Sequence, residues 1–210
     1  MKLAHIPRVC QTGVVTTRAE RREETHRALL AEGRRRFARD GYHAVVLEEV
    51  ARGIGATKGA AYHHFGSKAG LFRAVVEEAQ QEVGARVARA VEGYADPWDQ
   101  LIAGSRAFLS AGSDPDLQRI MLVDAPTVLG WNEWRAMDEA SSVTHLTEVL
   151  SALVTAGEIR PQPIEPLTRL LSGAMNEAAL WLAQSPDASL DETMAALITL
   201  LDGIRGVRSN

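Results

Sequence analysis

The chain has 210 residues, 46% of them hydrophobic and 24% charged, which is the ordinary balance of a soluble globular protein of one large domain or two small ones. No stretch free of Asp, Glu, Lys and Arg exceeds nine residues, so a transmembrane helix is not expected. The N-terminus lacks the hydrophobic segment and small-residue cleavage site of a secretory signal. The single cysteine, Cys10, cannot form an intrachain disulfide, which fits a reducing compartment. Together these features predict a cytoplasmic protein without membrane contact.

The net charge of −4 hides a strong asymmetry along the chain. Residues 1–75 hold 14 Lys and Arg against 7 Asp and Glu, whereas residues 76–210 hold 9 against 20. A basic first third on an acidic body is typical of a protein that touches nucleic acid with one end. The run of Arg34, Arg35 and Arg36 is equally compatible with a solvated helix face, so charge alone leaves both interpretations open.

A flexible tail and then a long helix are predicted at the N-terminus. Residues 1–17 have no clear periodicity and contain a proline and a glycine that would break a helix. A helix is predicted from Thr17 or Arg18 to Asp40, with acids early and arginines late, as the helix dipole favours. Gly41 ends this helix. Its narrow apolar stripe would pack beneath the elements that follow and consists of Leu29, Leu30, Gly33 and Phe37.

The next stretch predicts two short helices joined by a glycine turn. Leu47, Val50 and Ala51 share one face of the first helix. Two glycines, Gly53 and Gly55, end it, because glycine tolerates the left-handed backbone of a sharp turn. A second helix is predicted from an N-cap at Thr57 to about Phe65. Two short helices with such a turn are typical of a helix-turn-helix.

The second of these helices offers a surface suited to DNA. It has almost nothing apolar to bury, small residues at which a partner can approach the backbone, and a free N-terminus that favours phosphate. Ser67 caps the following helix, and Lys68 lies beside the same surface. This pattern predicts insertion into a major groove. The predicted DNA-binding residues are Thr57, Lys58, Gly59, Ala60, Tyr62, His63, His64 and Lys68.

The run GY…VARGIGATKGAAYHHFGSKAGLF resembles the DNA-binding domain of the TetR family of bacterial transcriptional regulators, over roughly residues 20–75. The resemblance implies that residues 57–64 form the recognition helix and that Lys68 contacts a phosphate. Two departures from the family pattern stand out. Val45 and Val46 occupy the place where a Ser or Thr commonly caps the first helix of the motif. Gly33 and Arg36 stand where Ala and Leu are more usual.

Only helices are predicted in the rest of the chain. A long helix from Ser67 to about Gly93 links the basic and acidic parts, and Asp-Pro pairs at residues 96–97 and 114–115 begin two more. We expect the first of these to end near Gly112 and the second to be interrupted by Pro126. A helix over residues 130–156, a proline-rich loop and two final helices complete an all-α chain. The predicted units are a helix-turn-helix domain at 18–66, a linking helix at 67–93 and a ligand-binding and dimerisation domain at 94–210.

The last two helices are the expected dimer interface. The first of them mixes small residues with Leu180 and Trp181, so apolar groups occur on more than one face. Two such helices can pair with their copies in a four-helix interface, which the resemblance also implies. The alternative is a helix buried within the monomer. We favour the homodimer, because helix-turn-helix proteins generally bind two half-sites.

The middle helices hold most of the large and polarisable side chains. The resemblance implies a small-molecule pocket here, and ligand pockets are mostly apolar with a few polar groups. Tryptophans at helical spacing are more often plain core, and Asp124 could simply cap a broken helix, so each assignment has a structural alternative. The candidate ligand-binding residues are Phe108, Met121, Asp124, Trp131, Trp134, Asn176 and Glu177.

No catalytic, cofactor or metal motif emerges. Gly53, Gly55 and Gly59 have the wrong spacing for a dinucleotide loop. His63 and His64 are adjacent and would not converge on a metal. We therefore expect no enzyme but a repressor of TetR type, which binds a palindromic DNA operator as a dimer and is released by a small-molecule effector. An activator or a constitutive binder would share the fold. A helical small-molecule binding protein or enzyme, with its basic end used for protein contacts, is the alternative from another class.

Overall fold

The computed structural model describes residues 17–185 and 187–206, and all regular elements within them are helical. One isolated bridge pairs Ile159 with Arg205. The predicted all-α class is thus confirmed. The predicted tail lies outside the described residues, apart from Thr17. None of the described helices is long and apolar enough to cross a bilayer.

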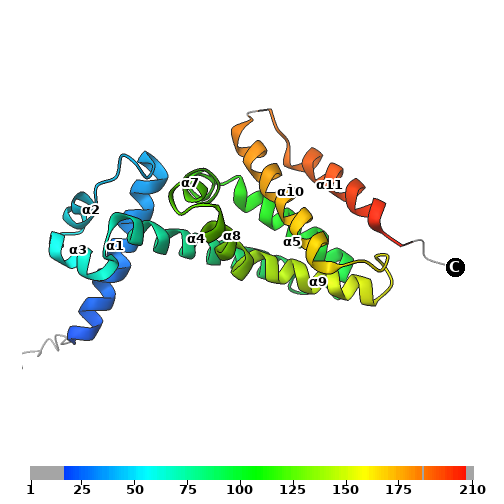
Figure 1. Ribbon diagram of the computed structural model, residues 1–210, viewed down its shortest axis with the longest axis horizontal. Helices are drawn as coiled ribbons and strands as arrows, with labels where there is room; N and C mark the ends of the chain where they lie inside the picture. Colours follow the sequence, from blue (N-terminus) through cyan, green and yellow to red (C-terminus); the bar gives the residue numbers. More distant parts are fainter. Residues whose placement is uncertain (1–16, 186, 207–210) are drawn as a thin grey trace, which may run out of the picture.

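Three helices gather at one end of the elongated molecule (Figure 1). The first, α1 (Arg18–Asp40), begins with a complete capping box, because the Thr17 and Glu20 side chains each accept a hydrogen bond from the other's backbone N–H. It ends at Gly41, whose φ of 79° favours glycine. The short helices α2 (Leu47–Gly53) and α3 (Lys58–Phe65) follow, as the sequence predicts.

A buried cluster holds α1 against α2, α3 and the start of the next helix. Phe37 and Phe72 meet edge to face with ring centroids 5.0 Å apart, and both are fully buried. Gly33 explains one departure from the family pattern, because a Cβ built there would lie 2.9 Å from Cδ2 of Leu71. The missing side chain lets Leu71 pack directly on the backbone of α1. Arg36 instead donates to Glu32 over 2.6 Å on the surface of α1.

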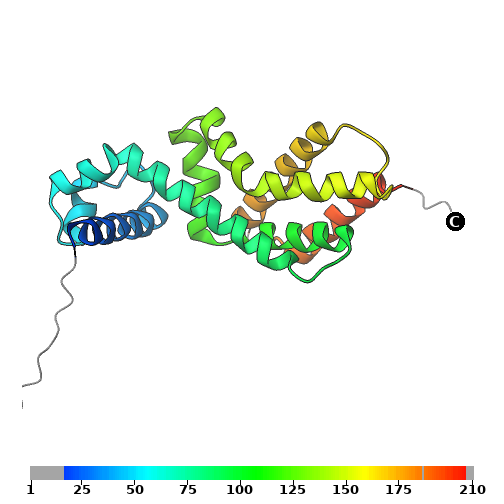
Figure 2. The ribbon, with the colours of Figure 1, turned by 90° about the horizontal axis from the view of Figure 1, so that it is seen from below.

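The long helix α4 (Lys68–Val91) runs from the three-helix end into the rest of the molecule (Figure 2). Ser67 caps it by accepting a hydrogen bond from the Gly70 N–H at 3.0 Å. Its buried stripe belongs to one hydrophobic core that runs through both ends, with Leu71 and Phe72 near its start and Val83 and Val87 further on. One rigid element therefore connects the two ends of the protein.

The larger end is a bundle in which α5 (Pro97–Gly112) packs against α4, α9 (Thr144–Thr155), α10 (Ile164–Gln184) and α11 (Leu190–Ile204). The Asp96 carboxylate caps α5 by accepting from the Trp98 N–H at 2.7 Å, with Pro97 as the first helical residue. Ser189 accepts from the Glu192 N–H at the start of α11. The Asp96–Pro97 start signal lies where the sequence predicts it.

The prediction that Pro126 interrupts a helix is wrong. The chain runs through α6 (Pro115–Gln118), a π-helical segment η1 (Arg119–Asp124) and α7 (Ala125–Val128) without a break. In η1 the hydrogen bonds are one residue longer than in an α-helix, as in the bond from Ala125 N–H to Ile120 O. The wider turn just before Pro126 accommodates a residue that lacks an N–H. The segment ends at Gly130, whose φ is 83°.

The predicted helix over residues 130–156 is also divided. It consists of α8 (Trp131–Asp138), a second π-helical segment η2 (Glu139–Val143) and α9. The helical path continues through all three, so the prediction misses only the change of hydrogen-bond pattern. The segment η2 packs against α4, an element distant from it in the sequence.

Candidate nucleic-acid interface and effector cavities

The helix α3 presents most of its side chains to the surface. Thr57 caps it by accepting from the Ala60 N–H at 3.1 Å, and Ala61 is its only buried residue. Gly66, with φ of 72°, ends it, and the turn into α4 is so tight that a Cβ at Gly70 would collide with the Phe65 carbonyl oxygen. The two glycines thus allow the tight turn that brings α3 close to the start of α4. The predicted DNA-binding residues of α3 share this largely exposed helix.

A carboxylate from α2 reaches the first turns of α3. Glu48 Oε1 lies 2.7 Å from Lys58 Nζ and accepts a hydrogen bond from the Tyr62 hydroxyl at 3.3 Å. The Lys58 ammonium also lies 5.4 Å from the centroid of the Tyr62 ring. The hydrogen bond from Lys58 lowers the pKa of Glu48, so the carboxylate is ionised. Sequence reasoning missed Glu48, because its partners lie ten or more residues further along the chain.

The other side of α3 borders a wide basic groove formed with the start of α1. His63 and His64 line it together with Arg18, Arg21 and Arg22. These three arginines were not among the predicted residues, because only the fold brings the first turns of α1 beside α3. Guanidinium groups next to an exposed helix are suited to phosphate contacts.

His64 is the less exposed of the two histidines of α3. Its ring lies 5.6 Å from that of His26, which in turn stacks on Phe65 with centroids 4.7 Å apart. Partial burial, followed by the charges of His26 and Arg22, lowers the pKa of His64. His64 is therefore predominantly neutral at pH 7.

The predicted phosphate contact Lys68 has an internal role in this structure. Its ammonium donates to the carbonyl oxygens of Tyr42 at 3.0 Å and His43 at 3.4 Å, and it lies 4.3 Å from the centroid of the Tyr42 ring. Lys68 thereby ties the start of α4 to the loop before α2. The helix α2 itself has no side-chain cap, because Val46 offers no acceptor, and Glu48 and Glu49 in its first turn complement the helix dipole instead.

Comparison with known proteins decides the family. Residues 29–75 match the model of the bacterial regulatory proteins of the tetR family, and residues 98–204 match that of a tetracyclin repressor-like C-terminal domain. The chain belongs to the TetR family. It is therefore a TetR-type transcriptional regulator with a helix-turn-helix for DNA.

Several known proteins are similar to this TetR-family chain. A TetR-family regulator from Pectobacterium atrosepticum is 34% identical, with a TM-score of 0.75 over 90% of this chain and 98% of that chain. The Transposon Tn10 TetC protein of Escherichia coli is 24% identical over 72% of this chain and 76% of its own length. A structure of RolR in complex with resorcinol has a TM-score of 0.69 at 19% identity, over 89% of this chain and 91% of that chain, and shows the fold alone.

The TetR-family body contains an apolar cavity of about 260 Å³ between α4, α5, α9 and α10. Val87, Leu101, Phe108 and Met175 form much of its wall. The polar groups that line it are few, and they are Gln100, Ser105, His145 and Glu148. Among the predicted ligand residues, Phe108 alone lines this cavity.

A second cavity of about 520 Å³ lies between α8, η1 and α10. Four of the predicted ligand residues line it, and they are Trp131, Trp134, Asn176 and Glu177. Trp131 is 64% exposed, whereas Trp134 is buried and its Nε1 donates to the Met121 carbonyl oxygen at 2.8 Å. One tryptophan of this wall is therefore a surface residue, and the other belongs to the core.

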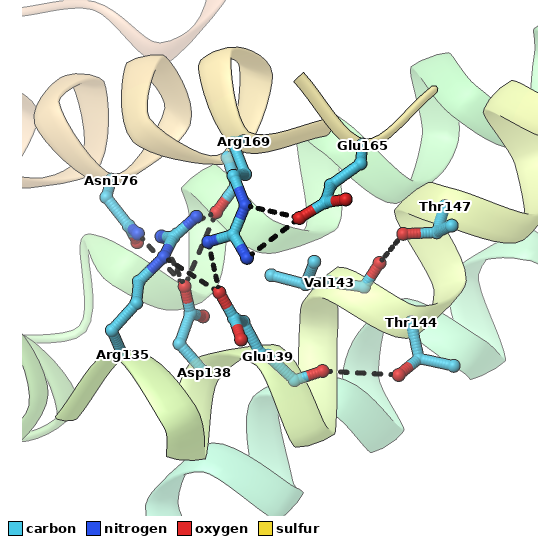
Figure 3. A network of polar contacts seen from close by, with 10 residues as sticks. Arg135, Asp138, Glu139, Val143, Thr144, Thr147, Glu165, Arg169 and Asn176 are labelled. Carbon is cyan, nitrogen blue, oxygen red and sulfur yellow. Dashed lines mark hydrogen bonds and ion pairs between the residues drawn. The ribbon is translucent and has the colours of Figure 1, made fainter. Parts of the chain in front are cut away.

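An ion-pair network lies beside the second cavity (Figure 3). The buried Asp138 carboxylate accepts from Arg135 Nη1 at 3.1 Å, from Asn176 Nδ2 at 3.3 Å and from the Ser172 hydroxyl at 3.4 Å. Arg169 donates to Glu139 at 2.6 Å and to Glu165 at 3.2 Å. Arg135 and Arg169, the two cations that line this cavity, are thus both paired with carboxylates. Among the described residues, no group of three or more His, Cys, Asp or Glu side chains could hold a metal ion.

The two remaining predicted residues occupy other places. Met121 is buried in η1 and borders a void of about 10 Å³, which Phe108 also lines. Asp124 lines neither of the two cavities, because its Oδ2 accepts from the backbone N–H of Tyr42 at 2.8 Å. Arg119 Nη1 likewise donates to the Arg39 carbonyl oxygen at 3.3 Å. The segment η1 therefore holds the end of α1 and the loop that leads to α2.

Proposed function

We propose that this TetR-family regulator is a repressor that binds a palindromic operator as a homodimer in the cytoplasm and leaves it when a small molecule binds. The observation that carries the proposal is the exposed face of α3, flanked by the arginine-lined groove of α1. A helix of this kind can enter the major groove while the guanidinium groups contact the backbone on one side. The residues proposed to contact DNA are the predicted ones of α3 together with Arg18, Arg21 and Arg22.

The outer faces of α10 and α11 support the homodimer. Leu170 on α10 and Leu200 on α11 are 73% and 67% exposed, and Trp181 is half exposed. These side chains come from the last two helices, which lie along one side of the body (Figure 1). Large apolar groups gathered on one face are typical of an interface. Two copies would bury them as a four-helix arrangement, which also places two reading helices on one operator.

The apolar cavity of about 260 Å³ is the proposed effector site. Its size suits a small monocyclic molecule, since an apolar cavity of about 150 Å³ accommodates benzene. The scarcity of polar groups favours an uncharged ligand with one or two hydrogen-bonding atoms. Resorcinol, which the RolR structure holds, is a ligand of this size.

Packing offers a route from this cavity to the DNA-binding end. Phe108 lies between the cavity and the small void bordered by Met121 of η1, and η1 bonds to Arg39 and Tyr42 through Arg119 and Asp124. A ligand that displaces Phe108 would therefore shift η1 and, through these bonds, α1. Such a ligand shifts the conformational equilibrium only by its differential affinity for the two states.

Electrophoretic mobility shift on DNA from upstream of the gene, titrated against salt, tests the function. We expect two protomers to bind one duplex and to prefer it over unrelated DNA. His63→Ala or Tyr62→Ala should change the sequence preference, whereas Arg21→Ala, which removes a cation from the groove beside α3, should weaken binding to all sequences and lower the salt slope. Arg106→Ala, which removes a cation from α5, is the matched control and should bind as the unaltered protein does.

Two results would contradict the proposal. Unchanged binding by the His63, Tyr62 and Arg21 variants would place the DNA-reading surface elsewhere. If the protein is not retained on duplex DNA of any sequence, at low salt or at high salt, the alternative of a helical small-molecule binding protein would be favoured instead.

A further inference from the structure

Glu48 occupies an unusual position for an acidic residue in a DNA-binding domain. It belongs to α2, yet its carboxylate lies against Lys58 and Tyr62, which are four residues apart and therefore on the same face of α3. No acidic residue occurs within α3 itself. A negative charge on this surface opposes phosphate binding by the neighbouring lysine, so a surface built for affinity alone would not hold one.

We infer that Glu48 is a specificity-determining residue of the DNA-reading surface and that its carboxylate accepts a hydrogen bond from a base amino group, that of cytosine or adenine, in the operator. The inference rests on the proposed function, in which α3 enters the major groove. In that groove the amino groups of cytosine and adenine are the hydrogen-bond donors, and the other polar groups are acceptors. An ionised carboxylate only accepts hydrogen bonds, so it distinguishes these two classes of group.

The geometry of the free protein prepares Glu48 for this role. The contacts with Lys58 and Tyr62 satisfy the carboxylate until DNA replaces them, and they hold it beside the first turns of α3, which reach base edges in helix-turn-helix proteins. The Lys58 side chain is 67% exposed and that of Glu48 is 29% exposed. The flexible lysine can therefore move to a phosphate or a guanine while the glutamate stays in place.

The neighbouring Glu49 supplies a matched control. Its carboxylate lies 3.5 Å from Nη1 of Arg36 on α1 and points to that helix instead of α3. Glu48→Gln and Glu49→Gln remove the same charge from adjacent positions in the first turn of α2. A general electrostatic effect on DNA binding would therefore appear in both variants, and an effect of base reading would appear only in the first.

The experiment uses the full-length protein and a random library of duplexes. An operator is selected with the unaltered protein, and affinities of the three proteins for it and for a scrambled duplex are measured at one salt concentration. We expect Glu48→Gln to bind the scrambled duplex more tightly and to lose about tenfold in the ratio of operator to scrambled affinity. A second selection with this variant should lose the preference at one base pair of each half-site and keep the rest. Glu49→Gln should keep both the ratio and the full motif.

The outcomes separate the inference from the function on which it rests. Equal ratios and identical motifs for Glu48→Gln and the unaltered protein would overturn the inference and leave the proposed function intact. The inference would also be overturned if Glu49→Gln broadened the motif as much as Glu48→Gln does. Failure of the unaltered protein to select any motif would overturn the proposed function, and with it the role assigned to Glu48.

Discussion

At the scale of single residues, His64 links the stability of the fold to pH. Its pKa in the folded protein is lowered below the ordinary value of 6.5 by partial burial and by His26 and Arg22, so the fold favours the neutral ring. Above pH 6.5 the ring is mostly neutral in both the folded and the unfolded chain. As the pH falls through 6.5, the unfolded chain takes up a proton first, and the free energy of unfolding therefore decreases.

Urea unfolding of the unaltered protein and of His64→Gln at pH 7.5 and 5.5 measures this contribution. The unaltered protein should lose more stability on acidification than His64→Gln, which has no imidazole to protonate. His63→Gln, at the exposed neighbouring position, should follow the unaltered protein. An equal loss in all three proteins would mean that the surroundings of His64 do not disfavour its charged form.

Local chemistry explains why several of these residues could be found from the sequence and others could not. Thr57, Ser67 and the Asp-Pro pairs act on backbone groups two or three residues away, so a linear pattern contains the information. The bonds from Lys68 to Tyr42 and from Lys58 to Glu48 join separate elements. Such pairings depend on how the helices cross, which no local pattern specifies, and Lys68 consequently has an internal partner that the sequence did not indicate.

At the scale of helices, Asp138 joins α8 to α10. The carboxylate is buried, which raises its pKa, and it collects hydrogen bonds from Arg135, Ser172 and Asn176. Asp138→Ala leaves a partly buried guanidinium and an amide without this acceptor, so we expect a loss of about 3 kcal/mol in the free energy of unfolding. Asp138→Asn keeps an acceptor oxygen and removes a charge that burial disfavours, so it should cost less than about 1.5 kcal/mol.

Urea unfolding at pH 7.5 compares the two Asp138 variants. A similar loss in both would show that the charge of Asp138, and not its capacity to accept hydrogen bonds, stabilises the contact between α8 and α10.

The π-helical segments are a second feature of the helices that the sequence does not reveal. Pro126 suggested a break to sequence reasoning, because a pattern of residue types does not reveal that one extra residue in the preceding turn lets the helix continue.

At the scale of the whole molecule, η1 lies between the second cavity, the small void beside Phe108 and the DNA-binding end. Leu122 lines the second cavity, Met121 borders the void beside Phe108, and Asp124 holds the Tyr42 N–H. Asp124→Ala leaves this N–H without its acceptor and frees the loop before α2. We expect weaker operator binding, because the distance between the two DNA-binding ends of a dimer would be less well fixed. Binding to unrelated DNA should change little.

Mobility shift on both duplexes checks the Asp124 prediction. Asp116→Ala, which removes the same charge from an exposed position of α6, is the control and should bind as the unaltered protein does. Equal weakening on operator and unrelated DNA would contradict a role in spacing. It would indicate a general effect of charge or of stability.

The tryptophans are distributed in a way that suits spectroscopy. All four of the chain lie between residues 98 and 181, and none lies in α1, α2 or α3. Trp134 is bonded to η1, Trp131 is at the surface of the second cavity, and Trp181 lies on the outer face of α10. Duplex DNA bound at α3 would touch none of these indoles. A change in tryptophan fluorescence on adding operator would therefore report a rearrangement of the larger end of the protein. The chain thus contains a built-in fluorescent probe of communication between its two ends.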